Sequence, residues 1–291
     1  MLNVKEKKIA IVGTSPIMLI FAKVLSKKNS VTIFEKKKIG GAWIYDKVMN
    51  LNTNLFTNVI VPTNKINEKK KIKLNNFLKN FNVKVKSNKK SYRSVSPFRP
   101  RPIYQYDFSS FYPQILKEKK INIKKINIKY VNERKQYVLI NKKLKFDMIF
   151  IPLYNSLRFI QYLNKKIFIP FKKIISKHII FVTKKPIIKD LYYCEQGHEF
   201  FDRMQIKKNK KLYIFTARIA KKFKSKNKLF FIKNFSFLDS NEVYYSKINS
   251  YINYYRNKKQ IENLKSINSK KIKIVNTAQL FISISTYFLK D

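Results

Sequence analysis

Residues 8–35, KIAIVGTSPIMLIFAKVLSKKNSVTIFE, contain the pattern that decides the fold. The apolar run at 8–12 has the length and composition of a strand buried on both faces, and Gly13 follows it directly. A second such run at 31–34 ends at Glu35. The apolar residues between the two runs recur with a helical period. The sequence therefore predicts a strand, a tight turn, a helix and a second strand that ends in an acid.

The residues after Gly13 predict where the helix begins. Ser15 is favoured at a helix N-cap, and Pro16 is tolerated at the first helical position because its missing N–H would have no partner there. We expect the helix over about 16–27, with its free N–H groups facing a pyrophosphate and a carboxylate of the second strand on the ribose. The residues expected at this dinucleotide site are Gly13, Thr14, Ser15, Pro16, Glu35 and Lys36.

A glycine pair after the acid adds a second motif. Gly40 and Gly41 precede Trp43 by two or three residues, and three of the four glycines of the chain fall within the two motifs. This arrangement resembles the extended Rossmann motif of FAD-dependent oxidoreductases, such as the amine-oxidase-like enzymes and the UDP-galactopyranose mutases. The resemblance implies a Rossmann-type domain that binds FAD, with NAD(P) as the alternative, and it adds Gly40, Gly41 and Trp43 to the cofactor site.

The chain departs from the family pattern G-x-G-x-x-G at two positions. Ser15 adds a Cβ where the backbone normally approaches the phosphates, and Met18 adds a long side chain where helix and strand normally pack closely. The Gly-Asp pair that these families carry near the C-terminus is also missing. These departures favour an alternative function, that of a catalytically inactive Rossmann protein serving as a binding or scaffold module.

Two later segments are expected to complete the same domain. Residues 121–152 resemble the β-meander of these flavoproteins, and their last strand, which follows Asp147, would re-enter the Rossmann sheet. Near the C-terminus we expect a helix over about 241–266, a strand over 271–275, and a helix opened by Thr277. That last helix would carry three residues on one face: Leu280, Ile284 and Phe288.

The remaining segments predict an inserted substrate domain, so the expected fold class is α/β, a Rossmann-type FAD/NAD(P)-binding domain with an inserted antiparallel sheet. Between about 160 and 238, apolar runs alternate with polar turns, as in antiparallel strands. These runs are KIFIPF, HIIFVT, KLYIFTARI and KLFFIKNF. A short helix is expected near 74–81. The first domain would comprise 1–45, 121–158 and 268–291, and the inserted domain 46–120 and 159–267.

Two polar segments supply candidate substrate residues. Arg93, Arg99 and Arg101, three of only eight arginines, lie in one proline-rich loop. A guanidinium recognises phosphate or carboxylate with a planar fork, so this loop would suit a nucleotide-sugar, and a solvated surface loop is the alternative. His198 and Arg203 lie in the most polar stretch of the expected sheet. His198 would supply acid–base chemistry if it faced a pocket, and a solvated turn is the alternative.

Composition bounds the other possibilities. The chain has 64 basic and 16 acidic residues, a formal charge of +48, but the lysines are spread along it and Gly (4) and Pro (9) are scarce, as in proteins of AT-rich genomes. We therefore expect no specific nucleic-acid partner, and non-specific polycation binding is a third hypothesis. The single cysteine, Cys194, excludes an internal disulfide and fits a cytoplasmic location.

The sequence leaves the catalytic residues and the oligomeric state open. Two histidines and one cysteine in these contexts form no catalytic triad, and no metal site is expected. His178 is expected to begin an apolar strand and to be structural. No apolar stretch is long enough to cross a bilayer, and the expected partner is a small-molecule substrate.

Overall fold

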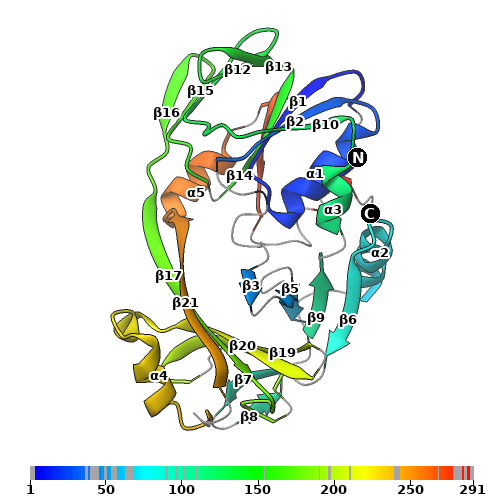
Figure 1. Ribbon diagram of the computed structural model, residues 1–291. Coiled ribbons are helices and arrows are strands. Elements are labelled where there is room, and N and C mark those ends of the chain that lie inside the picture. Colours follow the sequence, from blue (N-terminus) through cyan, green and yellow to red (C-terminus); the bar gives the residue numbers. More distant parts are fainter. Residues whose placement is uncertain are drawn as a thin grey trace.

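The computed structural model describes most of the chain. The described residues are 4–36, 39, 46–48, 51–53, 58–62, 68–88, 91–95, 98–100, 103–108, 111–153, 155–189, 191–195, 198–209, 211–238, 243–267, 269–277, 284, 287 and 288. Within them the fold is mixed α/β, with one parallel sheet and several antiparallel pairings (Figure 1). No helix of the described residues is both long enough and apolar enough to span a membrane.

A five-stranded parallel sheet forms one end of the molecule. Its strand order is β10-β2-β1-β14-β22, and every neighbouring pair is parallel. The strands are β1 (Lys8–Val12), β2 (Ser30–Phe34), β10 (Ile121–Lys124), β14 (Met148–Pro152) and β22 (Ile272–Val275). The chain therefore builds outward from β1 in one direction and then returns to build outward from β14 in the other.

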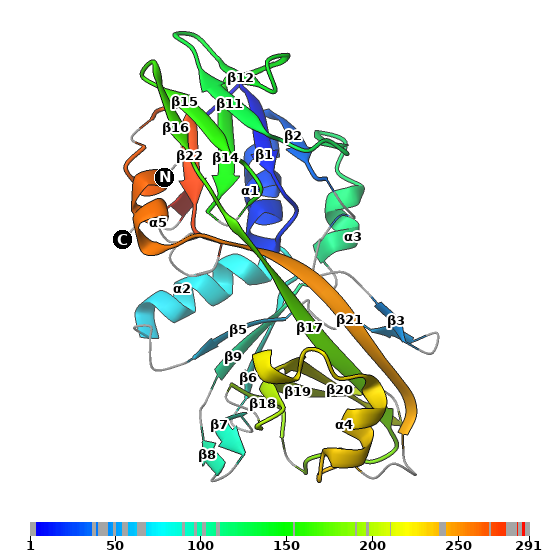
Figure 2. The same cartoon turned by 90° about the vertical axis from the view of Figure 1, so that its left-hand side faces the viewer.

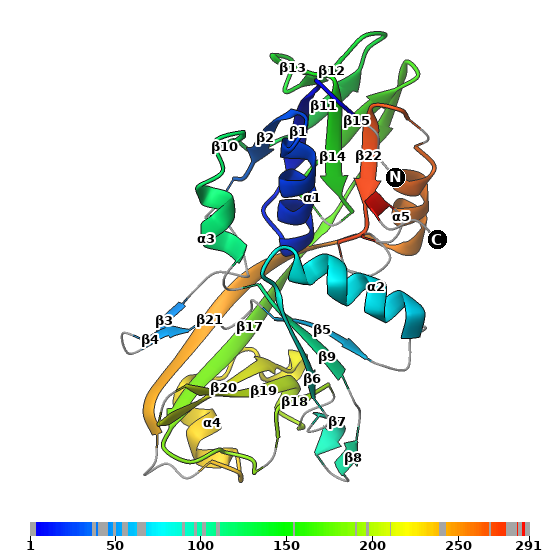
Figure 3. The ribbon, with the colours of Figure 1, turned by 90° about the vertical axis from the view of Figure 1, so that its right-hand side faces the viewer.

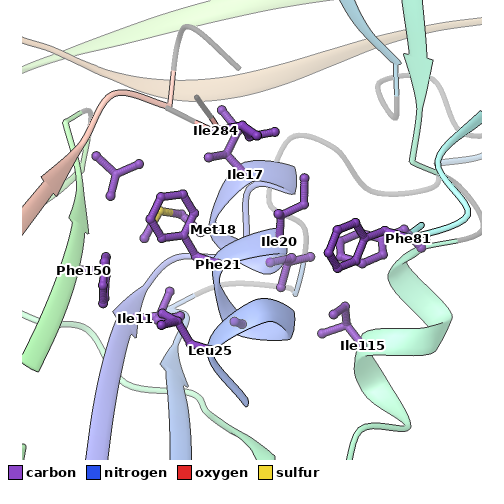
Figure 4. Packing of buried hydrophobic residues seen from close by; sticks show 14 of the residues in the cluster. Ile11, Ile17, Met18, Ile20, Phe21, Leu25, Phe81, Ile115, Phe150 and Ile284 are labelled. Atoms are coloured by element: carbon purple, nitrogen blue, oxygen red, sulfur yellow. The ribbon is translucent and has the colours of Figure 1, made fainter. Parts of the chain in front are cut away.

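Helix α1 (Pro16–Ser26) connects β1 to β2 and is buried along most of its length. Phe21 packs edge-on against Phe150 of β14, with ring centroids 5.4 Å apart, and against Phe288, with centroids 4.6 Å apart. Figure 4 shows Ile17 beside Ile284 and the side chain of Met18 beside that of Phe21. Because the sheet, α3 (Phe111–Leu116) and the C-terminal residues all contribute to its core, α1 is held in a fixed position.

A second five-stranded sheet packs on the other face of the parallel sheet. Its order is β13-β12-β11-β15-β16, and its apolar residues share a core cluster with Ile149, Ile151 and Ile272. The strands are β11 (Tyr130–Glu133), β12 (Val138–Ile140), β13 (Leu144–Phe146), β15 (Phe159–Tyr162) and β16 (Lys165–Phe168). Helix α5 (Lys258–Lys265), with a capping box at Asn257, contributes Leu264 to the same core.

A seven-stranded sheet lies at the opposite end, joined to the rest by two long strands (Figures 1 and 2). Its order is β21-β17-β20-β19-β18-β7-β8. The strands are β7 (Ser91–Val95), β8 (Phe98–Pro100), β17 (Lys172–Thr183), β18 (Tyr193–Cys194), β19 (Phe201–Asn209), β20 (Leu212–Ile219) and β21 (Val243–Tyr255). Helix α4 (Lys228–Asn234) packs Phe231 into the apolar cluster on one face of this sheet.

Smaller elements lie between the two ends (Figure 3). A three-stranded antiparallel sheet has the order β5-β9-β6, and β3 pairs with β4. The bounds are β3 (Asp46–Val48), β4 (Leu51–Thr53), β5 (Asn58–Pro62), β6 (Lys84–Asn88), β9 (Ile103–Asp107) and α2 (Glu68–Lys79). A short 3-10 turn, Lys221–Phe223, precedes α4. Leu74 and Leu78 of α2 are buried in the core that also contains α1.

Two expectations about secondary structure are wrong. The helix expected over 241–266 is instead the strand β21, followed by α5, because β21 pairs with β17 from Tyr255↔Lys172 to Val243↔Thr183. The run KLFFIKNF, expected as a strand, forms α4. There the Asn227 side chain accepts a hydrogen bond from the Phe230 N–H at 3.0 Å and caps the helix, while Phe231 and Phe235 are buried one turn apart.

Other expectations differ in extent. The proline-rich arginine segment is not a loop throughout, because β7 and β8 pair antiparallel within it. His178 lies in the middle of β17 and does not begin the strand. The run KIFIPF contributes β16 to the second five-stranded sheet, in which β11 and β15 pair in parallel, and not to the seven-stranded one. Of the helix expected after Thr277, residues 278–283 lie outside the described residues, and Ile284 and Phe288 are buried.

Candidate functional site

The turn between β1 and α1 is built on a glycine with positive φ. Gly13 has φ +85°, a conformation that side-chain-bearing residues rarely adopt. Its N–H donates to the Phe34 carbonyl at 2.8 Å, which fixes the turn to the end of β2. A Cβ added to Gly13 would meet only Pro152 Cγ, at 4.0 Å. The glycine is therefore required here by backbone geometry and not by lack of space.

Glu35, directly after β2, reaches back to this turn. Its Oε2 accepts hydrogen bonds from the Thr14 N–H at 3.1 Å and from the Thr14 hydroxyl at 2.7 Å. Thr14 itself is buried. The predicted acid and the predicted turn are thus joined by two hydrogen bonds, which hold the carboxylate at the carboxyl ends of β1 and β2.

The start of α1 carries a buried hydroxyl without a capping role. Ser15 is the N-cap residue and Pro16 the first helical residue, as expected, but the Ser15 side chain makes no capping hydrogen bond. Its Oγ is buried and has no hydrogen-bond partner among the described residues. A buried hydroxyl normally makes a hydrogen bond, so this oxygen is suited to bond a polar group bound at the helix start. This observation fits a diphosphate at the turn.

Met18 occupies the position of the third family glycine. It is fully buried and belongs to the same core cluster as Phe21 and Phe150 (Figure 4). The thioether therefore packs in the interior, where it fills space between α1 and its neighbours. This placement leaves the front of the turn to the residues from Gly13 to Ser15.

The segment after β14 lies at the same end of the sheet as the Gly13 turn, because β14 is the parallel neighbour of β1 and the carboxyl ends of both strands point the same way. Arg256, only 1% exposed, donates to the Leu153 and Leu157 carbonyls, each at 2.9 Å, and to Asn155 Oδ1 at 3.4 Å. Burial lowers the pKa of Arg256 to about 10. Sequence reasoning missed this arginine, since nothing in its surroundings distinguishes it from a surface cation.

Several predicted site residues cannot be placed at this turn. Gly40, Gly41, Trp43 and Arg101 lie outside the described residues, and Arg93 on β7 and Arg99 on β8 are described by their backbone alone. Lys36 contacts the Tyr254 hydroxyl, with its Nζ 4.6 Å from that ring's centroid.

His198 begins a tight turn, as the alternative expected: it pairs with Phe201 through two backbone hydrogen bonds, and Glu199 in the turn is exposed. The His198 ring, however, lies among aromatic rings. Its ring is 5.0 Å from Phe200 and 5.3 Å from Phe235, centroid to centroid. Nδ1 is buried with no hydrogen-bond partner among the described residues, and burial lowers the pKa of this imidazole. The strand that follows it, β19, lies at the opposite end of the molecule from β1 (Figure 1). The structure therefore does not bring His198 to the Gly13 turn.

Comparison with solved structures shows that this fold is shared with known proteins. The PF1083 protein from Pyrococcus furiosus matches with a TM-score of 0.57 and 12% identity over 98% of both chains. The tetrameric 2-methyl-3-hydroxypyridine-5-carboxylic acid oxygenase matches with a TM-score of 0.52 and 11% identity over 98% of this chain and 81% of its own. The p-nitrophenol 4-monooxygenase PnpA from Pseudomonas putida DLL-E4 matches with a TM-score of 0.50 and 10% identity, over 93% and 72%.

Comparison by sequence gives no relative. No protein-family model and no curated protein matches the chain. At identities of 10% to 12%, the solved structures establish a common fold and nothing finer. None of these three names mentions a nucleotide-sugar, so the comparisons give no support for that substrate.

Proposed function

We propose that this chain binds FAD at the Gly13 turn and acts as a flavin-dependent oxidoreductase on a small molecule. The observation that carries the proposal is the junction of β1 and β14, where the order of strands along the sheet reverses. The order β10-β2-β1-β14-β22 supports a Rossmann-type sheet, and in open parallel sheets of that kind ligands bind outside the carboxyl ends of the strands, where the strand order reverses. Gly13, Thr14 and Glu35 all lie there.

The chain's own residues would bind and orient the cofactor. The N–H groups at the start of α1 and the Ser15 hydroxyl would face the diphosphate, where the helix dipole favours negative charge. Glu35 would accept hydrogen bonds from ribose hydroxyls, and Thr14 would hold that carboxylate in place. When bound, a flavin supplies the redox chemistry itself, so few recognisable catalytic side chains are needed. The shared fold with two oxygenases supports this class of function.

The first experiment is the visible spectrum of the purified protein. Bound oxidised flavin gives peaks near about 370 and 450 nm. Affinity is then measured by titrating FAD into flavin-free protein and following the quenching of flavin fluorescence. Glu35→Gln should weaken FAD binding about tenfold, since the charged acceptor is lost. The matched control is Glu262→Gln on the exposed part of α5, which should leave the affinity unchanged.

The alternative is a Rossmann module that binds no dinucleotide. The replacement of two motif glycines by Ser15 and Met18 favours it. A colourless protein whose melting temperature does not respond to added FAD or NADPH would support this alternative and refute the flavin proposal.

A further inference from the structure

Three strands of the seven-stranded sheet bring basic side chains into one row. His178 on β17 lies directly opposite Arg218 on β20, and Arg218 lies directly opposite Arg203 on β19. Asn249 of β21 lies opposite His178 on its other side. Side chains of directly opposite residues point to the same face, with Cβ atoms about 5 Å apart. We call Asn249, His178, Arg218 and Arg203 the basic row.

The row lies on the face of the sheet that α4 does not cover. The neighbours of its members along the strands, Ile179, Ala217 and Met204, point to the other face and are buried in the cluster that contains Phe231 of α4. Side chains alternate between the faces of a sheet, so the basic row points away from α4. Arg203 is exposed, and Arg218 keeps 35% of its side-chain surface, so a ligand can reach both guanidinium groups.

The charges in the row do not balance. Two guanidinium groups opposite one another on neighbouring strands repel each other. The carboxylate of Asp202 accepts from Arg218 Nε at 3.1 Å, helped by the register shift between Phe201 and Arg203. Burial, with Arg218 and Arg203 nearby, lowers the pKa of His178 to about 4, so the imidazole is neutral at pH 7. Among the described side chains, the two guanidinium groups and the Asp202 carboxylate carry a net charge of +1.

The use of arginine at this place is selective. The chain has 64 basic residues, of which only eight are arginine, yet two of those eight face each other here. Arginine presents a planar fork that matches a carboxylate with two parallel hydrogen bonds, which lysine cannot do. The codon preference that explains the abundance of lysine does not explain this pair.

We propose that the basic row binds an organic carboxylate, with Arg203 and Arg218 as the bidentate donors and His178 beside them. One carboxylate would neutralise the net charge of the row and relieve the repulsion between its two guanidinium groups. Under the function proposed above, this anion is the substrate, so the inference rests on that function for the ligand's role but not for its binding.

The two histidines of the chain provide a direct readout. Proton NMR of the purified protein shows two imidazole C2–H resonances, and His198→Gln removes one of them and so assigns the other. Benzoate is the probe and benzamide its neutral control. Benzoate should move the His178 resonance in a saturable titration and raise the apparent pKa of that imidazole, because a nearby anion favours the charged form. Benzamide should move neither resonance.

Variants distinguish benzoate binding at the basic row from non-specific attraction of an anion to a positively charged protein. Arg203→Gln and Arg218→Gln should each weaken benzoate binding about tenfold, the value of one charged hydrogen-bonded contact. Arg134→Gln removes the same charge from an exposed turn between β11 and β12 and should change the affinity less than about twofold. Because Arg203 is exposed, its variant should retain the fold.

The outcomes are distinct from those of the flavin test. Equal effects of Arg134→Gln and Arg203→Gln, or shifts by benzoate that do not saturate, would overturn the basic row as a binding site. Benzoate binding in a protein that takes up no flavin would uphold the row and refute the oxidoreductase. Flavin binding without a benzoate response at His178 would support the flavin proposal and refute the basic row as a binding site.

Discussion

The Gly13 turn at one end of the molecule and the basic row at the other differ in the charges they contain. At the Gly13 turn, the acid Glu35 is joined to Thr14 by two hydrogen bonds. In the basic row, Arg203 and Arg218 face each other, with Asp202 bonded to Arg218. The first end is organised around a carboxylate and backbone N–H groups, whereas the second has an excess of positive charge.

This difference matters because acids are scarce in the chain. With 16 acidic and 64 basic residues, most cations cannot have an acidic partner. The acids are therefore informative where they are buried or bonded to the backbone, as Asp147 is to the Lys8 N–H at 2.7 Å. Such contacts organise the parallel sheet, whereas at the basic row the proposed ligand would supply the negative charge.

Replacing Arg256 tests whether β21, which links the two ends of the molecule, stabilises the residues that follow β14. Arg256 follows β21 directly and holds Leu153, Asn155 and Leu157 by three hydrogen bonds. Arg256→Leu should lower the free energy of unfolding by about 3 kcal/mol or more, since buried carbonyls lose their donors. Urea unfolding measures this.

The control for Arg256 is Arg158→Leu. Both guanidinium groups lie over the Phe171 ring, 5.7 Å away for Arg158 and 5.8 Å for Arg256, but Arg158 is exposed. The control should cost less than about 1 kcal/mol. Equal losses in the two variants would show that the ring contact, and not the buried hydrogen bonds, stabilises this edge.

Gly13→Ala sharpens the comparison at the first end. A side chain at φ +85° should cost about 1–2 kcal/mol of stability, although the nearest atom, Pro152 Cγ, leaves room for a Cβ. FAD affinity should fall as well if the turn relaxes away from Glu35. Gly13→Asn should cost less, because Asn tolerates positive φ better than Ala. Thermal unfolding and the FAD titration measure both effects, and an unchanged melting temperature in Gly13→Ala would refute the strain argument.

Local patterns in the sequence predict the first end well. The strands 8–12 and 31–34, the helix start at Pro16 and the strand near 271–275 are all confirmed within a residue or so. These elements follow from short-range rules, namely apolar runs of strand length and a proline at the first helical turn. The presence of Glu35 at the turn follows from the same spacing.

The other end depends on contacts that the sequence does not show. The segment Val243–Tyr255 is a strand because it pairs with β17, and this pairing overrides local propensity. The pairing is not visible in the local sequence, because β17 lies far earlier in the chain. Arg203 was expected as a substrate residue, but its place beside Arg218 and His178 could not be predicted, since the three come together only through strand register. The buried role of Arg256 likewise requires knowing which strand ends beside Leu153.

The smallest expected effect is a dependence of stability on pH at the basic row. The folded-state pKa of His178, about 4, lies below its ordinary value of 6.5, so between these values the unfolded chain binds more protons than the folded one. Stability should therefore fall as the pH is lowered, by about 1 kcal/mol between pH 7 and pH 5.5 from this group.

His178→Gln should remove this part of the slope in urea unfolding measured at several pH values. His198, whose pKa is also lowered by burial, contributes with the same sign, so His198→Gln serves as the comparison and the double variant should be flatter than either. Saturating benzoate should reduce the slope of the native protein, because an anion at Arg203 and Arg218 raises the pKa of His178. A slope that benzoate leaves unchanged would mean that the two arginines hold no carboxylate beside this histidine.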